Sequence, residues 1–405
     1  MFHCISGFDV VNLRERLQSV FLDECLSRME LEGVVFDDHS NAYLNQQLAN
    51  KRLDAIVFRS CQHARIGYWA QVEALTLHVS QPFIDRISIG NQLVELNLTS
   101  ISVSEELAAS LGRQLGANPS LKRLDFSESR FLNDGPRFFA QGLAVNQTLE
   151  IVNFADCNLM DESVSHLVDA LRHNQPLVNL DISFNKCRSM GVAALASLVT
   201  QKPSLKELSM GFQAFGESKQ IELQPLILAL GNYTSKLTRF EIGGNSICDG
   251  DIPYLVDMLC SNTSISSLDL SGNRITIAGI QVLSSRLKDV KGLRHLALEE
   301  NNLRSSSLQP LANALKSNLS LVDMEVDDLI ASGNVNEDTW RILAYYLDLN
   351  WGGRRLLKEH SSLPASIWPA LLARASRPQE FKFGRDVKQH DVSFFLLQEI
   401  AHLLV

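Results

Sequence analysis

Acidic side chains near the end of the chain's central region are the strongest candidates for a chemical role. Like charges that lie close together repel one another and raise one another's pKa, and a basic ligand relieves that cost. The cluster therefore predicts a binding site for a positively charged partner. Its members are Glu299, Glu300, Asp323, Glu325, Asp327 and Asp328.

Two phenylalanines and an arginine form a second candidate for partner binding. Phe184 and Phe212 occupy equivalent places in the sequence pattern described below, and Arg239 follows in the next copy of that pattern. Exposed aromatic rings beside an arginine are typical of binding hot spots. The alternative, which we favour from sequence, is that the rings pack under the edge of a loop.

Enzymatic motifs are missing from the sequence. It contains no HExxH, GxxxxGK(S/T), GxSxG or CxxC pattern, and its histidines lack the spacing of metal ligands. We therefore expect no catalytic residues, no metal and no cofactor. The seven cysteines are unclustered. Cysteines used in this way indicate reduced thiols, so we expect a cytoplasmic or nuclear protein.

The chain's length and composition limit the remaining classes. A chain of 405 residues exceeds the roughly 250–300 residues at which a single core stops growing, so several domains or a repeat array are expected. No stretch approaches the ~18 apolar residues of a membrane span, and the first 17 residues do not resemble a secretory signal. A net charge of −9 also argues against a nucleic-acid ligand.

The elements that must position these candidates follow a regular repeat, which we write as successive rows. Each row has apolar residues at its first, fourth and sixth positions, as in Leu121, Leu124 and Phe126, and Asn is frequent at the ninth. A row therefore reads LxxLxLxx(N/C)x(L/I/C), the pattern of a leucine-rich repeat. All the spacings are 28 except one of 32. The rows begin at Leu93, Leu121, Leu149, Leu177, Leu205, Leu237, Ile265, Leu293 and Leu321.

Each row predicts one strand followed by one helix. The LxL alternation indicates a short strand with one buried face. The Asn after it can bond backbone groups at the turn, so stacked rows predict an Asn ladder. The second half of the row is amphipathic at helical spacing, as in DIPYLVDMLCSN. A lone row buries too little to fold, so the rows must stack continuously.

The regular rows predict four regions. Residues 1–30 should form an N-terminal helical cap, and residues 31–92 short irregular rows beginning at Leu31, Leu53 and Val72. Residues 93–331 hold the regular repeats, and residues 332–405 a helical C-terminal cap. Basic residues such as Arg354 and Arg355 are frequent in that cap, and we favour a solvated surface for them.

The 28-residue row resembles the ribonuclease-inhibitor type of leucine-rich repeat, which also occurs in Ran GTPase-activating proteins and NOD-like receptors. The resemblance covers about residues 93–330. It implies an α/β fold, a right-handed solenoid (horseshoe) with a parallel concave sheet and a helical convex face. It does not imply ribonuclease inhibition. Residues 345–405, with LDLNWGGRRLL and LPASIWPALLARA, resemble the tail of leucine-rich-repeat proteins of diatoms and related algae.

The strand positions between core residues are free to bind a partner. Fourteen acidic and two basic residues occupy the third, fifth, seventh and eighth positions of these rows. Three of the acids, Asp125, Asp181 and Asp269, are at the fifth position, where Asp is common in this repeat. We assign them a solubilising role.

These observations predict a non-catalytic scaffold or adaptor that holds a basic protein surface against the acidic rows. We expect a monomer before binding, and neither nucleic acid nor membrane as a partner. The alternative is a regulatory protein of the Ran GTPase-activating type.

Overall fold

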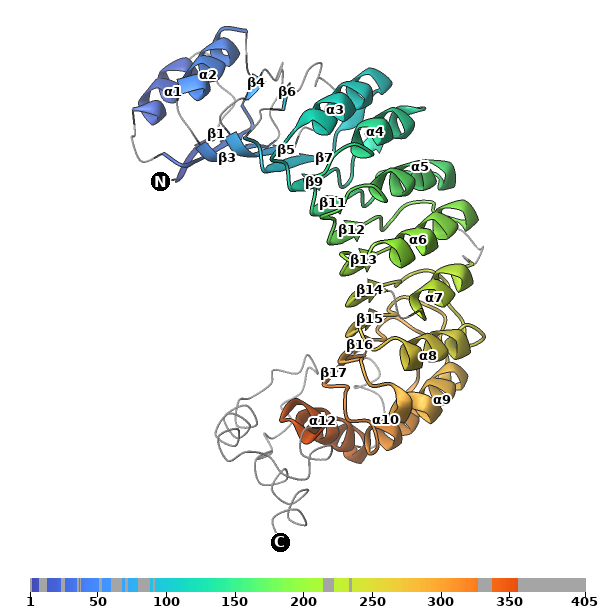
Figure 1. Cartoon of the computed structure of the whole chain (residues 1–405). Coiled ribbons are helices and arrows are strands. Elements are labelled where there is room, and N and C mark those ends of the chain that lie inside the picture. Colours follow the sequence, from blue (N-terminus) through green and yellow to red (C-terminus); the bar gives the residue numbers. More distant parts are fainter. Residues whose placement is uncertain are drawn as a thin grey trace, which may run out of the picture. The chain divides into compact units, whose positions relative to one another are not determined.

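The chain folds into two compact units, Met1–Gln213 and Ala214–Val405 (Figure 1). Both consist of parallel strands alternating with helices. The computed structural model describes residues 2–6, 13–22, 26–34, 36, 38–50, 53–59, 68–69, 72–78, 88–89, 92–213, 222–232, 235–326 and 337–355.

Parallel strands of the first unit follow one another in a single sheet. Val152 lies opposite both Leu124 and Leu180, its counterparts in the rows before and after, so the register equals the length of the row. The strand order is β1 (Phe2–Ser6), β2 (Arg28–Glu32), β3 (Leu53–Arg59), β5 (Val72–His78), β7 (Glu95–Thr99), β9 (Arg123–Asp125), β11 (Ile151–Asn153), β12 (Asn179–Asp181) and β13 (Glu207–Ser209).

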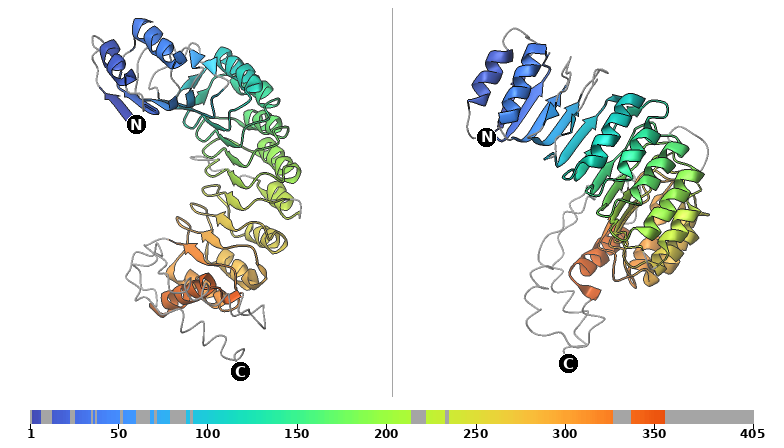
Figure 2. Two further views of the ribbon diagram at one scale, coloured as in Figure 1. Left: turned by 60° about the vertical axis from the view of Figure 1, so that its left-hand side comes forward. Right: turned by 45° about the horizontal axis from the view of Figure 1, so that its top comes forward.

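The helices of the first unit all lie on one face of this sheet (Figures 1 and 2). They are α1 (Leu13–Phe21), α2 (Asp38–Asn50), α3 (Glu105–Ala117), α4 (Gly135–Leu143), α5 (Asp161–Leu171) and α6 (Ser189–Gln201). Two further strand pairs lie in the connections, β4 (Tyr68–Trp69) with β6 (Ser88–Ile89) and β8 (Ser102–Val103) with β10 (Arg130–Phe131).

The second unit repeats the arrangement, with shorter helices between its strands and a longer one after the last strand. Its strands are β14 (Arg239–Glu241), β15 (Ser267–Asp269), β16 (His295–Ala297) and β17 (Asp323–Glu325), and neighbours again pair at an offset of one full row. The helices are α7 (Gln224–Leu230), α8 (Ile252–Ser261), α9 (Ile277–Arg286), α10 (Leu308–Leu315) and α12 (Glu337–Trp351). Short 3-10 turns, η2 (Leu287–Asp289) and η3 (Ser305–Ser307), follow α9 and precede α10.

The first, fourth and sixth positions of the rows form the core between sheet and helices. Leu121, Leu124 and Phe126 are fully buried, as are their counterparts in the following rows. In the first unit aromatic residues contribute to this core. Phe126 stacks on Phe154 with ring centroids 5.9 Å apart. Burial of each such side chain contributes about 1.5–3 kcal/mol.

The predicted Asn ladder is present at the ninth position. The Asn185 side chain accepts hydrogen bonds from the backbone amides of Cys157 and Leu159 in the preceding row, and donates to the carbonyl of Phe154. Asn273 makes equivalent bonds in the second unit. These bonds pair backbone groups that leave the strands at the turn, which would otherwise be buried without partners.

A second ladder runs along the ends of the helices. Asn146, Asn262 and Asn318 are buried there, and each accepts a hydrogen bond from the backbone amide that begins the next row. Lys202 occupies the corresponding place after α6. Its ammonium donates to the carbonyl of Asn174, and only 3% of the residue is exposed.

Carboxylates of one row cap the helix of the next. Asp161, in the first turn of α5, accepts hydrogen bonds from the backbone amides of Arg188, Met190 and Gly191 at the start of α6. Asp249 accepts from the backbone amide and hydroxyl of Thr276 before α9. A carboxylate at a helix N-terminus pairs orphan amides and complements the helix dipole. Adjacent rows are therefore joined by side chains as well as by strand pairing.

Arg354 closes the last described row. It is 2% exposed, and its guanidinium donates to the carbonyls of Leu315 and Lys316 at the end of α10. The same group lies 4.7 Å from the ring centroid of Tyr346. The solvated surface expected for this basic segment is therefore wrong for Arg354, because its charge pairs helix carbonyls that lack partners within α10.

The α/β solenoid expected from the repeat is confirmed. Strands begin at or near the expected rows from Leu53 onward, and the helix expected after the last row is α12. The start at Leu31 is wrong, because β2 pairs Leu31 with Phe58 rather than with Leu53. The N-terminal region also contributes strand β1 to the sheet beside helix α1, so it is more than a helical cap.

Candidate functional site

The side chains at the third and fifth positions of each row, which belong to the strand, point away from the helices. They alternate with buried residues, as Arg123 and Asp125 flank Leu124. We call this surface the open face of each unit, and the two open faces are considered separately.

Acidic residues at the fifth position have a structural role. Asp125, Asp181 and Asp269 each accept a hydrogen bond of 2.8 Å from the backbone amide two residues later. Such bonds stabilise the turn that ends the strand. The solubilising role expected for these three is therefore incomplete, because the carboxylates also fix the backbone.

Other charges on the open face of the first unit are paired across strands. Arg123 lies 3.5 Å from the carboxylate of Glu95. Asn179 donates to Glu207 at 2.6 Å. Asn179 is neutral, so only Arg123 compensates charge here, and six carboxylates against one arginine at the third, fifth, seventh and eighth positions of the regular rows make this open face acidic as well.

The open face of the second unit is strongly acidic. Along β14 to β17 and the turns that follow, its third, fifth, seventh and eighth positions hold six carboxylates against one arginine and one histidine. We call the part of this surface formed by Glu299, Glu300, Asp323 and Glu325 the acidic face. Asp327 and Asp328, predicted to belong to it, lie outside the described residues. The six carboxylates are Glu241, Asp269, Glu299, Glu300, Asp323 and Glu325.

The acidic face is formed by adjacent rows. His295 lies opposite Asp323 and Ala297 opposite Glu325 in the pairing of β16 with β17. The backbone carbonyl of Glu299 accepts from Gly272 of the row before. Neighbouring strands are about 4.8 Å apart, less than the roughly 10 Å Debye length at 0.1 M salt, so the charges of this face act together.

His295 is a member that the sequence did not single out. Its Nδ1 lies 3.4 Å from the Asp323 carboxylate. The signal was available, because the two residues hold the same position in consecutive rows and the row length places such residues side by side. Protonation of His295 would compensate part of the acidic charge.

Phe184 and Phe212 come together in the first unit as expected. Their rings stack with centroids 4.6 Å apart and planes 4° from parallel. The preferred interpretation, burial under a loop edge, is wrong for Phe184, which is 46% exposed. Arg239 belongs to the second unit, where its Nε lies 2.5 Å from the Glu241 carboxylate.

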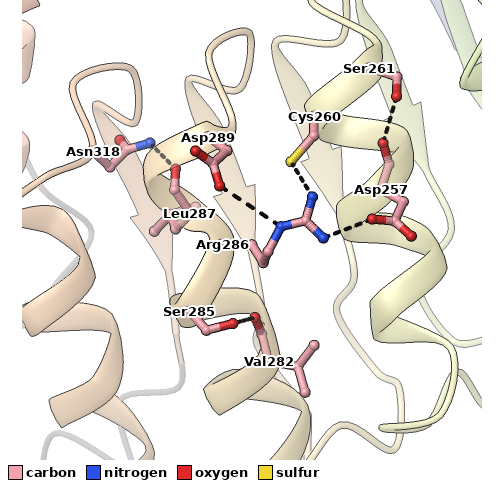
Figure 3. Close-up of polar contacts among 9 residues, drawn as sticks. All are labelled: Asp257, Cys260, Ser261, Val282, Ser285, Arg286, Leu287, Asp289 and Asn318. Carbon is pink, nitrogen blue, oxygen red and sulfur yellow. Dashed lines mark hydrogen bonds and ion pairs between the residues drawn. The ribbon is translucent and has the colours of Figure 1, made fainter.

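Cys157, Cys187 and Cys260 lack the lowered pKa of an activated thiol. Cys157 and Cys187 are buried, and burial holds their pKa far above the usual value of a thiol. Cys260 contacts Arg286, whose guanidinium also pairs with Asp257 and lies near Asp289 (Figure 3). Burial raises the pKa of Cys260 although Arg286 opposes that shift. A raised pKa disfavours the nucleophilic thiolate.

The described ranges contain no group of three or more His, Cys, Asp or Glu side chains placed to hold a metal ion. None of their helices combines the length and apolar character needed to cross a membrane.

Comparison with known proteins identifies the class of repeat. The family model described as Leucine Rich repeat matches residues 261–284. Human NACHT, LRR and PYD domains-containing protein 13 is 31% identical over 103 residues, which are 25% of this chain and 10% of that protein. The mouse protein 4C of the same name is 28% identical over 123 residues, 30% of this chain and 12% of that protein. The matches thus span about a tenth of these relatives.

Among solved structures, an internalin from Listeria monocytogenes shares 16% identity. It covers 82% of this chain and 94% of its own, with a TM-score of 0.45. The repeat pattern, the parallel sheet and the matched family model together show that the chain is a leucine-rich-repeat protein. Proteins of this class are usually binding scaffolds rather than enzymes.

Proposed function

We propose that this protein is a non-catalytic scaffold or adaptor that holds a basic protein partner against the acidic face of the second unit. The observation that carries the proposal is the clustering of four carboxylates in two adjacent rows of that open face, where six carboxylates in all oppose Arg239 and His295. The fold supports it, because rigid stacked rows hold these side chains at fixed spacing.

The physical advantage of such a face is in association. Carboxylates in adjacent rows add their fields, and a basic surface is attracted before contact. Release of their mutual repulsion adds to the affinity. We include the predicted residues Asp327 and Asp328 in the proposed site. Phe184, Phe212 and Arg239 remain proposed contacts elsewhere on the two open faces.

We also propose that the chain acts in the cytoplasm or nucleus and is monomeric before it binds. Free thiols at Cys157, Cys187, Cys248 and Cys260 support a reducing compartment. The ribonuclease-inhibitor type of repeat and the algal resemblance of the C-terminal segment stay predictions.

The test is a pull-down from a lysate of the source cells at low and high salt. It compares the wild type with Glu299→Lys/Glu325→Lys and with Glu222→Lys/Asp289→Lys. The second variant changes the net charge by the same amount, but at exposed or half-exposed positions beside α7 and α9.

We expect a basic protein to be retained at low salt by the wild type and by the Glu222→Lys/Asp289→Lys variant. The acidic-face variant should not retain it at low salt. In high salt none of the three proteins should retain it. Equal retention by all three proteins would contradict the proposal. The GTPase-activating alternative stays a prediction, which stimulated GTP hydrolysis by a purified small GTPase would support.

A further inference from the structure

The eighth position of the rows has a left-handed backbone. In the first unit φ is 57° at Ser100, 60° at Glu128, 53° at Asp156, 56° at Phe184 and 54° at Phe212. In the second unit the same place is taken by Gly244, Gly272 and Glu300. The left-handed conformation therefore belongs to the turn of the row and not to any one side chain.

Phenylalanine is an unfavourable residue at this position. Glycine has no steric penalty there, and Asn and Asp are tolerated because their short polar side chains bond locally. A bulky side chain with positive φ is an outlier, and such strain is frequent at functional sites. Two successive rows nevertheless place a phenyl ring here.

The two rings form a platform that remains accessible. Their centroids are 4.6 Å apart, close to the ~4.8 Å between neighbouring strands, so the stack runs from row to row. Phe184 is 46% exposed and Phe212 is half-buried. The ring of Phe184 is on the side of the stack that is nearer to the row of Asp156.

Carboxylates occupy the same position in the two rows before this platform. The amide of Asp156 donates to Ser183 at 2.9 Å and the amide of Phe184 donates to Gly211 at 2.9 Å, so Asp156 and Phe184 are in consecutive, aligned turns. Asp156 is exposed. Glu128, one row further, accepts from the Ser100 hydroxyl at 2.9 Å.

We infer that Phe184 and Asp156 form a binding site for an arginine side chain of a protein partner. The guanidinium stacks on the Phe184 ring while its N–H groups donate to the Asp156 carboxylate. A planar guanidinium can make both contacts at once, whereas an ammonium is a compact, strongly hydrated charge that stacks poorly. This inference rests on the proposed protein-binding function. It specifies which side chain of the partner this part of the first unit binds.

The test uses two matched probes, N-acetyl-arginine amide and N-acetyl-lysine amide, each with a single positive charge. They are titrated into the full ¹⁵N-labelled chain, and TROSY spectra follow the backbone amides of Asp156, Phe184 and Phe212. We expect the arginine probe to shift these amides in a saturable way, and to bind about two- to five-fold more tightly than the lysine probe.

Two variants separate the ring from the charge. Phe184→Asn removes the ring but keeps a residue that accepts left-handed backbone, so the fold is preserved. Asp156→Asn removes only the charge. Phe184→Asn should abolish the preference for arginine, whereas Asp156→Asn should weaken both probes.

Equal shifts from both probes, or an unchanged arginine preference in Phe184→Asn, would overturn the inference. The Glu299→Lys/Glu325→Lys variant should bind the arginine probe at these amides as the wild type does. The observed amides all belong to the first unit. If the arginine probe does not bind there, the acidic-face proposal is unaffected and is still tested by the pull-down. Loss of the pull-down partner likewise leaves this result in place.

Discussion

At the scale of single residues, Lys202 is the member of the helix-end ladder that differs in chemistry. Asn146 and Asn318 offer a carbonyl oxygen to the amides that begin the next row, and an ammonium has none to offer. Burial lowers the pKa of Lys202. The ladder is thus interrupted by a charge whose hydration has been removed.

Replacement of this lysine should stabilise the first unit. We expect Lys202→Asn to raise the free energy of local opening of α6 by about 1–2 kcal/mol, because it removes the buried charge, while the Leu205 amide already donates to the Lys202 backbone carbonyl. Native-state hydrogen exchange of α6 and β13 measures the change. Faster exchange in the variant at neutral pH would contradict this assignment.

The same substitution predicts a change in pH dependence. A lysine with a lowered folded-state pKa destabilises the fold while it is charged. The wild type should therefore gain stability as the pH rises from the lowered folded pKa to the unfolded value of about 10.4. Lys202→Asn should lack this gain. Urea unfolding at pH 7 and at pH 10 compares the two.

Cys260 allows a test, at the scale of single residues, of how neighbouring charges shift the pKa of a thiol. Arg286 lowers the thiol pKa and Asp289 raises it. We expect Arg286→Met to slow the alkylation of Cys260 by iodoacetamide at pH 8 and Asp289→Asn to accelerate it, as measured by peptide-resolved mass spectrometry. Rates that change in the same direction in both variants would show that access, and not charge, governs this thiol.

At the scale of the elements, the contacts that join one helix to the next depend on glycines. A Cβ added at Gly279 would lie 2.5 Å from the Asp249 carboxylate and 3.0 Å from Ile275. Burial raises the pKa of Asp249, but bonds from Thr276 and Gly279 outweigh it, and the pKa is lowered overall. Glycine at position 279 thus leaves room for the Asp249 carboxylate at the N-terminus of α9.

Gly279→Ala should therefore destabilise the second unit by about 1–2 kcal/mol despite the better helix propensity of alanine. In an Asp249→Ala background the same substitution should cost less, because the collision with the cap is gone. Urea unfolding of the four proteins measures the coupling. Gly250→Ala is the control, since its Cβ would meet only Cys248 at 3.8 Å. Equal costs in both backgrounds would exclude the cap as the cause.

The cap of Asp249 also predicts an acid effect. Its lowered pKa contributes stability that is present above the unfolded pKa and is lost as the pH falls through the folded pKa. The advantage of the wild type over Asp249→Ala should therefore shrink in acid.

The row pattern was sufficient to predict the strands, the helices and the Asn ladder, because all three follow from periodic positions within one row. It did not reveal the caps of Asp161 and Asp249, which join residues of adjacent rows. The signal that would have found them is a shared spacing slightly longer than a row, from Asp161 to Gly191 and from Asp249 to Gly279. Contacts between rows can be predicted from sequence only when two rows are aligned side by side.

The candidate sites show the same limit. The sequence placed the acids of the acidic face in adjacent rows, because row length alone determines that arrangement. It misjudged Phe184, since the exposure of a ring at a turn depends on the left-handed backbone that aims it. It also misjudged Arg354, whose partners lie more than a full row earlier, at the end of α10.

At the scale of the whole molecule, stability in a repeat array is the sum of rows and of contacts between neighbours. The last row of the second unit has a neighbour on one side only within the described residues, so its closing contacts matter more than those inside the array. Arg354 supplies such a contact through the carbonyls of Leu315 and Lys316.

Arg354→Met should loosen this end locally by about 1.5–3 kcal/mol, the range for hydrogen bonds to a charged group. We expect faster hydrogen exchange in α10 and α12 and unchanged exchange in α8. Arg355→Met, which removes a bond from a half-exposed side chain to the Lys291 carbonyl, is the matched control and should have a smaller effect. Faster exchange throughout the unit would show that the rows unfold together instead.

The left-handed eighth position of each row has a consequence for engineering new specificities on this scaffold. A combinatorial library that varies all the surface positions equally would lose many clones to backbone strain at this one site. Restricting it to Gly, Asn and Asp, while the third row position is varied over residues other than Pro, would keep the library foldable, because the backbone amide at the third position donates to the strand ladder. The fifth position should keep a short side chain that can accept a hydrogen bond, because it fixes the turn. Rows diversified under this rule could be exchanged between positions in the array, since each presents its variable side chains on the same backbone.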